Sequence, residues 1–254
     1  MGFLLDIDGT ILEAGVEIPG AAATIATLRE RGVPFLFATN TSRKSRGAVA
    51  ASLREAGVPA DDDDVLSAGY AAAAYLASEG VRRVQVLMPP DSLEDWRDFE
   101  ITEEDPEAVV VGDLGEAFDF RTLNVAFRNL HGGATLVAAQ KNRFWKAADG
   151  WTLDAGAFVA ALEYAARVEA IVVGKPAPGF FRQAARLLGH SPSSLTIVGD
   201  DVESDVVGGH ASGLRTVLVR TGKFDASRLA RTPASARPHV VIDSIADLPR
   251  LLDS

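Results

Sequence analysis

Hydrophobic residues along the chain gather in short runs that alternate with amphipathic stretches, which is the pattern of a parallel α/β sheet. The runs predict strands at 2–7, 33–40, 82–88, 108–113, 134–140, 169–176, 195–200, 214–220 and 238–243. The amphipathic stretches predict helices at 19–32, 46–57, 68–79, 120–131, 154–167 and 178–189. Gly and Pro mark the joints, with Pro19 near the start of the first helix and Gly32 at its end.

The middle third of the chain has the pattern of a small α/β unit of its own. We therefore expect a discontinuous core made of residues 1–66 and 171–254, with a second α/β domain inserted at 67–170. One continuous sheet would give a similar hydrophobic pattern, so the pattern alone leaves both arrangements open.

Composition narrows the function more by exclusion than by indication. The 254 residues include no cysteine, which excludes disulfides, thiolate catalysis and cysteine-based metal sites and fits a cytoplasmic protein. No apolar run approaches the ~20 residues of a membrane-spanning helix, and no basic segment precedes an apolar stretch as in a signal peptide. A net charge of −10 disfavours nucleic acid and anionic membranes as partners. An anionic substrate would need a cation or aligned backbone N–H groups.

Polar residues lie at the carboxyl ends of four of the predicted strands, the edge where open α/β sheets form their ligand crevice. The stretches are "DIDGT" with Asp6 and Asp8, "FATNTSR" with Thr39 and Asn40, "VVGKPAP" with Lys175, and "IVGDDVESD" with Asp200, Asp201 and Asp205.

Two carboxylates at one strand end need an explanation. Alternate residues share a face of a strand, so Asp6 and Asp8 would stand side by side, which raises carboxylate pKa values unless a positive group lies against them.

Each stretch alone has an ordinary explanation as a strand end, helix cap, loop lysine or turn. Together they supply acidic groups for a hard cation, one lysine, and hydroxyl and backbone donors. These are the parts that a magnesium-dependent phosphoryl-transfer site requires.

In order, spacing and residue choice, these stretches resemble the four motifs of the haloacid dehalogenase superfamily. An insert between the second and third motifs resembles its class IIA branch, which includes 4-nitrophenylphosphatase-like enzymes. The stretches "VVVGDLGEAFDFRTLNVAF", "LDAGAFVAALEYA" and "GGHASGLRTVLVRTGKF" look like the phospholysine phosphohistidine inorganic pyrophosphate phosphatase group. The resemblance implies an α/β fold with a Rossmann-like parallel-sheet core and an inserted α/β cap domain.

The resemblance also implies residue roles. Asp6 would be the nucleophile, and Asp8 would protonate the leaving oxygen and later deprotonate water. Mg²⁺ would be held by the Asp6 carboxylate, the Asp8 carbonyl and Asp200, with Asp205 supporting the metal indirectly. The phosphate would be bound by Thr39, the Asn40 N–H and Lys175, with Gly9 allowing a tight turn beneath it. Asp201 is assigned to a turn or supporting role.

Substrate choice would depend on the cap stretches "QKNRFWKAADG" and "LDAGAF". Lys141, Arg143, Phe144, Trp145 and Asp154 are candidates for contacts with the leaving group. An exposed loop with one buried aromatic residue explains the first stretch equally well. The segment "ILEAGVEI" would form a small flap, as in the family.

The leading hypothesis is therefore Mg²⁺-dependent hydrolysis of a small phosphorylated metabolite through an aspartyl-phosphate. Two alternatives are phosphoryl transfer to an acceptor other than water, as in a mutase, and a catalytically idle phosphate-binding protein. The resemblance leaves room for a homo-oligomer, although no surface stripe in the sequence establishes one.

Overall fold

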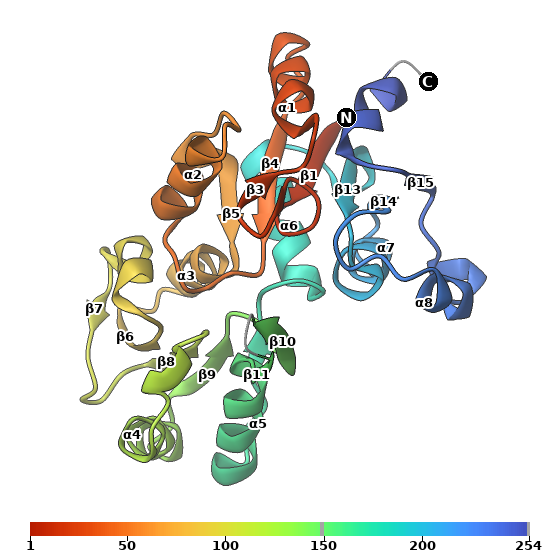
Figure 1. Ribbon diagram of the computed structural model, residues 1–254. Helices are drawn as coiled ribbons and strands as arrows, with labels where there is room; N and C mark the ends of the chain where they lie inside the picture. The colour runs from red at the N-terminus through yellow and green to blue at the C-terminus, as the bar shows by residue number, and fades with distance from the viewer. Residues whose placement is uncertain (148–149, 253–254) are drawn as a thin grey trace. The chain divides into compact units, whose positions relative to one another are not determined.

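The computed structural model describes residues 1–147 and 150–252 (Figure 1). Its chain forms two compact units. The first unit consists of Met1–Thr39, Val49–Leu66 and Lys175–Ser254, and the second consists of Asn40–Ala48 and Ser67–Gly174. The predicted domain boundaries, at 66/67 and 170/171, stay predictions.

The first unit contains a six-stranded sheet in the order β15-β14-β13-β1-β4-β5. Its strands are β1 (Gly2–Asp6), β4 (Phe35–Thr39), β5 (Val65–Ser67), β13 (Leu195–Gly199), β14 (Arg215–Val219) and β15 (Val240–Ile242). β1 pairs in parallel with both β4 and β13, and β13, β14 and β15 are also parallel. The strand order reverses between β1 and β13, which is where open α/β sheets bind ligands.

Helices cover both faces of this sheet because the strands are apolar on both sides. On one face, Phe3 and Leu5 pack with α1 (Ala21–Glu30), α2 (Arg46–Glu55) and the C-terminal 3₁₀ helix Ile245–Leu252. Figure 1 shows α1 close to this last helix, and the Thr24 hydroxyl donates to the Ile245 carbonyl at 3.1 Å. On the other face lie α6 (Pro178–Leu188) and α7 (Gly208–Ala211). The short helix α8 (Ala226–Arg231) follows β14.

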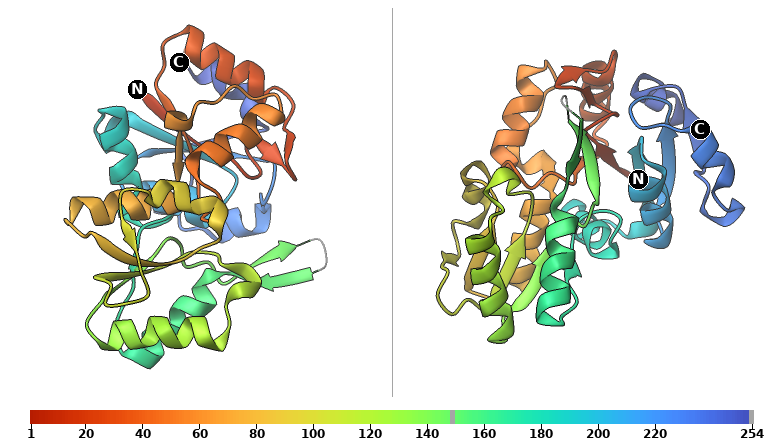
Figure 2. Two further views of the ribbon diagram at one scale, coloured as in Figure 1. Left: turned by 90° about the vertical axis from the view of Figure 1, so that its left-hand side faces the viewer. Right: turned by 60° about the horizontal axis from the view of Figure 1, so that its bottom comes forward.

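The second unit contains a five-stranded parallel sheet in the order β12-β9-β8-β6-β7. Its strands are β6 (Arg83–Leu87), β7 (Glu100–Ile101), β8 (Ala108–Val111), β9 (Thr135–Ala138) and β12 (Ile171–Val172). Successive residues of β8 belong to different core clusters: Val110 packs towards α3 (Ala68–Ser78), and Val109 towards α4 (Phe120–His131) and α5 (Ala155–Ala166). α4 and α5 lie side by side along the sheet (Figure 2). The expected parallel α/β fold with helices is confirmed.

The segment before Lys175 differs from the prediction. The strand expected at 169–176 is only two residues long, and β12 pairs with β9 in the second sheet. Gly174 allows the chain to pass close to the end of β9, because a Cβ added at this position would lie only 2.3 Å from the Ala139 carbonyl oxygen. Lys175 therefore does not follow a strand of the first sheet, although it belongs to the first unit.

The stretch predicted as a loop at 140–150 contains regular structure. β10 (Phe144–Ala147) pairs antiparallel with β11 (Gly150–Leu153), and residues 148–149 lie outside the described part of the chain. Phe144 lies opposite Leu153, and its ring packs edge-on against the Trp151 ring with the two ring centres 5.2 Å apart. Such cross-strand pairs stabilise a hairpin.

A second hairpin occupies the stretch expected to form a flap. β2 (Leu12–Glu13) and β3 (Val16–Glu17) pair antiparallel. The two residues between them, Ala14 and Gly15, have φ angles of +50° and +81°, as a tight hairpin turn requires. Its role as a flap stays a prediction.

Candidate active site

The candidate site is built where β1 and β13 end side by side. Asp6 is the last residue of β1, and Asp200 directly follows β13. Because parallel strands end at the same edge, the sheet brings together two carboxylates that are separated by 194 positions in the sequence. Both side chains are buried.

Lys175 joins this pair to a third carboxylate. Its Nζ donates to Asp6 Oδ1 at 2.6 Å, to Asp205 Oδ1 at 2.7 Å and to the Ala38 carbonyl at 3.2 Å. Only 3 % of Lys175 is exposed. Burial lowers the pKa of Lys175, but the carboxylates of Asp205 and Asp6 more than offset this and raise it overall. Lys175 therefore carries its positive charge at physiological pH.

The three carboxylates carry more negative charge than Lys175 can balance. Asp6, Asp200 and Asp205 each present an oxygen within 4.8 Å of the others. Burial, and then the charge of Asp6, raise the pKa of Asp200 to about 8. Burial raises the pKa of Asp205 to about 7 against the lowering effect of Lys175. The pKa of Asp6 is raised by burial in spite of Lys175. The site thus favours an additional cation.

The residues present fit a hard divalent metal. Asp200 Oδ1 is buried and accepts no hydrogen bond from any described residue, so one lone-pair direction is left for a ligand. Carboxylate oxygens are the ligands that Mg²⁺ and Ca²⁺ prefer. The expected carboxylates Asp6, Asp200 and Asp205 come together here, which supports a divalent-metal site without identifying the metal.

Asp200 is held through its other oxygen by a segment that the sequence analysis missed. The backbone N–H of Lys223 donates to Asp200 Oδ2 at 2.6 Å, and an added Cβ on either Gly9 or Gly222 would lie 2.1 Å from that oxygen. Position 9 therefore requires a glycine for two reasons: the backbone packs closely against Asp200, and its φ is +88°. The available signal was "TGK" after the apolar run 214–220, at the end of the strand next to β13.

The Lys223 side chain adds positive charge near the carboxylates. Much of it is exposed to solvent. Partial desolvation lowers the pKa of Lys223, but four carboxylates, led by Asp200, raise it by more.

Asp8 lies just beyond β1, where it is exposed and forms an isolated bridge with Leu12 at the base of the β2–β3 hairpin. β1 ends at Asp6, one residue before the predicted end of the strand at residue 7, so Asp8 lies outside it. The charge of Asp8 still raises the pKa of Asp6, so the two carboxylates interact electrostatically.

The second motif is divided between the units. Thr39 is the buried last residue of β4, the strand next to β1. Asn40 is the first residue of the second unit, where its Oδ1 lies 2.9 Å from the position of a Cβ added to Gly174.

Asp201 and Asp205 have different environments. The Asp201 carboxylate accepts the N–H groups of Glu203 and Ser204, and it begins the π-helical turn Val202–Val207. Asp205 is 1 % exposed, and its Oδ2 accepts the Asp201 N–H at 3.2 Å. The turn or supporting role expected for Asp201 stays a prediction.

The candidates for substrate choice lie in the second unit. Lys141 forms an ion pair with Glu163 at 2.7 Å, and the Arg143 guanidinium lies 6.0 Å from the centre of the Phe144 ring. Asp154 is buried, caps α5 through the Ala155 N–H, and accepts a hydrogen bond from Gln140. Trp145 contributes its backbone to β10, and its side chain lies outside the described part.

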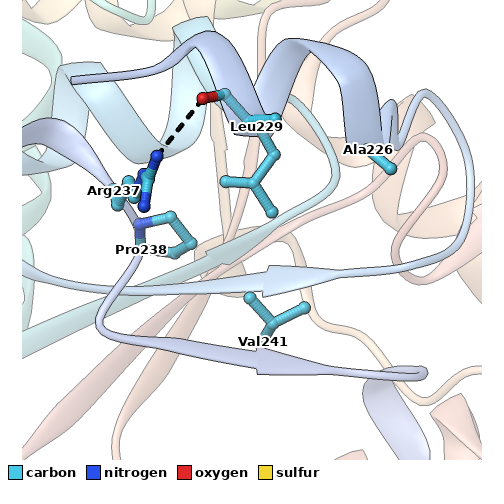
Figure 3. Close-up of a pocket in the computed structure, with 6 residues that line it drawn as sticks. Ala226, Leu229, Arg237, Pro238 and Val241 are labelled. Carbon is cyan, nitrogen blue, oxygen red and sulfur yellow. Dashed lines mark hydrogen bonds between the residues drawn. The ribbon is translucent and has the colours of Figure 1, made fainter. Parts of the chain in front are cut away.

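A cavity of about 360 Å³ elsewhere in the first unit lacks the chemistry of the candidate site. It lies between α8 and the β15 region (Figure 3) and is lined by Ala226, Leu229, Ala230, Arg237, Pro238 and Val241. The Arg237 guanidinium donates to the carbonyls of Thr232 and Ala230 at 3.1 and 3.2 Å. Its charge is therefore already committed to the backbone.

Within residues 1–147 and 150–252, no helix combines the length and apolar character that a membrane-spanning segment requires.

Comparison with known proteins places the chain in a family. The family model described as haloacid dehalogenase-like hydrolase matches residues 3–102, and one described as HAD-hydrolase-like matches residues 172–248. The chain is 38% identical over 224 residues to the human haloacid dehalogenase-like hydrolase domain-containing protein 2, covering 88% of this chain and 85% of that protein. It is 34% identical over 252 residues to human phospholysine phosphohistidine inorganic pyrophosphate phosphatase, covering 97% and 90%.

A solved structure extends this likeness to the whole fold. The p-nitrophenyl phosphatase from Archaeoglobus fulgidus superposes with a TM-score of 0.91 at 30% identity, and the match covers 98% of each chain. Sequence, family models and fold thus agree, and the protein belongs to the haloacid dehalogenase-like hydrolase family.

Proposed function

We propose that this hydrolase is a Mg²⁺-dependent phosphatase that cleaves small phosphate monoesters through an aspartyl-phosphate on Asp6. The observation that carries the proposal is the buried group of Asp6, Asp200 and Asp205 at the reversal point of the sheet, where Asp6 and Asp205 pair with Lys175. Relatives named as phosphatases support the reaction class.

Mg²⁺ would be held by the carboxylates of Asp6 and Asp200 and, by family resemblance, by the Asp8 carbonyl. Asp205, which accepts a hydrogen bond from Lys175, would support the metal indirectly. When bound, Mg²⁺ supplies positive charge that offsets the carboxylates and polarises the phosphoryl group.

The remaining chemistry belongs to the chain. A carboxylate oxygen of Asp6 forms a bond to phosphorus while the bond to the leaving oxygen breaks, and Asp8 gives that oxygen a proton. Water then attacks phosphorus, Asp8 accepts its proton, and cleavage of the phosphorus–Asp6 bond releases phosphate. The exposure of Asp8 suits this exchange of protons with water.

The positive charge of Lys175 offsets the negative charge of Asp6 and of the phosphoryl group that is transferred. The Thr39 hydroxyl and Asn40 N–H would donate to phosphate oxygens.

A small phosphorylated metabolite is the substrate class that we propose. Lys141, Arg143, Phe144 and Trp145 stay candidates for contacts with it, whereas the contacts of Asp154 support a structural role. A cytoplasmic location, a homo-oligomeric state and the absence of nucleic-acid and membrane partners stay expectations from the sequence.

Hydrolysis of p-nitrophenyl phosphate with and without Mg²⁺ tests the proposal. A wider panel includes phosphomonoesters, phosphoamides and pyrophosphate, since one relative is named for such substrates. Acid quenching should trap phosphate on the peptide that contains Asp6. Inactivity over the whole panel would contradict hydrolysis, and formation of a new phosphoester in place of free phosphate would indicate mutase-like transfer.

A further inference from the structure

The turn that follows β14 makes two contacts with the candidate site. The Thr221 hydroxyl donates to the Gly9 carbonyl at 2.5 Å, and the Lys223 N–H donates to Asp200 Oδ2 at 2.6 Å. We propose that Thr221, Gly222 and Lys223, called here the 221–223 turn, form a positioning element that orients Asp200 towards the metal. This inference rests on the proposed function, since that function supplies the metal.

The two oxygens of Asp200 have unequal surroundings. Oδ2 accepts the Lys223 N–H, whereas Oδ1 is buried and accepts no hydrogen bond from a described residue. A carboxylate without such a contact can rotate and present either oxygen. The hydrogen bond to Oδ2 therefore selects Oδ1 as the oxygen left for a cation, and it does so before the cation binds.

Two glycines let the backbone approach Asp200 closely enough for this contact. A Cβ added to Gly222 would lie 2.1 Å from Asp200 Oδ2 and 2.5 Å from the Gly9 Cα. A Cβ added to Gly9 would lie equally close to the same oxygen and 2.9 Å from the Gly222 Cα. The two turns therefore pack directly against each other, and neither has room for a side chain.

Thr221 connects the 221–223 turn to the loop that carries the reacting aspartates. Gly9 directly follows Asp8, and its carbonyl is the acceptor for the Thr221 hydroxyl. This hydrogen bond holds the loop and the 221–223 turn at a fixed separation, so Asp200 lies at a fixed distance from the end of β1. Thr221 thus positions the loop by its hydrogen bond to Gly9, and Lys223 positions Asp200 by its backbone N–H.

Mg²⁺ binding to the full chain, measured by calorimetry without substrate, tests the inference. Gly222→Ala should displace Asp200 and weaken Mg²⁺ binding at least about tenfold, the size of effect typical of residues that orient metal ligands. Thr221→Val removes one hydrogen bond and should weaken binding by about three- to tenfold. Thr221→Ser keeps the hydroxyl and should bind Mg²⁺ like the wild type.

Gly32→Ala is the matched control for the glycine. Gly32 has a φ of +63°, close to the +60° of Gly222, but nothing lies within 4 Å of an added Cβ. Both substitutions therefore carry a similar backbone strain, and only Gly222→Ala also disturbs Asp200. If Gly222→Ala does not fold, the comparison between Thr221→Val and Thr221→Ser decides.

Unchanged Mg²⁺ binding in both Gly222→Ala and Thr221→Val would overturn the inference and leave the proposed phosphatase intact. Weakening by Thr221→Ser or Gly32→Ala as large as in the test variants would overturn it too, because strain or general loosening would then explain the effect. A wild type that binds Mg²⁺ but hydrolyses no phosphate compound would end the proposed function, while the binding data would still decide the role of the turn.

Discussion

The two parallel sheets of this protein have similar layers, but the polar residues at their carboxyl ends differ in whether neighbouring residues satisfy their charges and hydrogen bonds. In the second unit, Asp113 follows β8, pairs with Arg43 at 3.1 Å and accepts the Gly115 N–H at 3.0 Å. Gln140 comes shortly after β9 and donates to Asp154. These polar groups satisfy one another within the unit.

In the first unit the corresponding groups carry more negative than positive charge. Three buried carboxylates lie close together, the buried Lys175 pairs with two of them, and Asp200 Oδ1 has no donor among the described residues. An unpaired buried polar group costs free energy, and here it is a carboxylate oxygen among two further carboxylates, a combination that a bound cation would stabilise. A strand end in an α/β sheet does not identify a site, whereas uncompensated buried charge at that end does.

The comparison is tested most strongly by removing one carboxylate from each sheet. Asp6→Asn should lower kcat for p-nitrophenyl phosphate by at least about 10³-fold, because it removes the proposed nucleophile. Asp113→Asn keeps an acceptor oxygen for Gly115 and should change kcat by less than about threefold. Similar losses in the two variants would show that the sheets do not differ in this way.

Metal removal should have the next largest effect. Chelation with EDTA should abolish hydrolysis, and added Mg²⁺ should restore it. Asp200→Asn should raise the Mg²⁺ concentration for half-maximal activity at least about tenfold, since it removes one charge from the proposed metal ligands. Asp243→Asn, at a largely exposed carboxylate, is the control and should leave this concentration unchanged. Full activity in EDTA would contradict the metal-dependent mechanism.

Much of this site could be predicted from the sequence because its residues follow apolar strands. Asp6, Thr39 and Asp200 stand directly at strand ends, and sheet geometry then brings Asp6 and Asp200 together. Lys175 was found by its motif, but the strand predicted at 169–176 is only two residues long and pairs with β9, and so short a strand carries almost no periodic signal.

The 221–223 turn was missed for a different reason. Lys223 contributes a backbone N–H to Asp200, and any residue except proline can supply that group, so side-chain chemistry gave no signal. The β10–β11 hairpin was missed because its charged residues resemble a loop, and its cross-strand aromatic contact joins residues on both sides of an intervening turn.

The charge imbalance also predicts how the Mg²⁺-free protein responds to pH. The pKa values of Asp200 and Asp205 in the folded state are raised to about 8 and about 7, above the ordinary carboxyl value of 3.8. Between the ordinary value of 3.8 and these raised values, the folded state therefore binds more protons than the unfolded state, and stability is lost as pH rises through this window. In EDTA, Tm should fall between about pH 5 and pH 8.

Two variants sharpen this measurement. Asp200→Asn should reduce the fall in Tm, whereas Asp113→Asn in the second unit should keep the slope of the wild type. Saturating Mg²⁺ should also reduce the fall, because on the proposed function it would bind the ionised carboxylates of the folded state. A Tm in EDTA that rises steadily over this range would contradict the charge imbalance.

The smallest expected effect concerns Lys141 in the second unit. Its ion pair with Glu163 is partly exposed, with 39% of the Lys141 side chain accessible, and such pairs contribute at most about 1 kcal/mol. Lys141→Met should lower the free energy of unfolding by less than this, as measured by urea denaturation. If the pair is the whole role of Lys141, KM for phosphorylated substrates should stay within about twofold of the wild type.

Glu163→Gln separates the ion pair from a contact with substrate, because it disrupts the same pair from the other side. If Lys141 only pairs with Glu163, neither variant should change KM. A contact between Lys141 and the leaving group would raise KM in Lys141→Met alone, because Glu163→Gln leaves the lysine charge in place. A rise confined to Lys141→Met would therefore show that a polar group already satisfied within the second unit also serves the reaction, and the contrast between the two sheets would no longer be sharp.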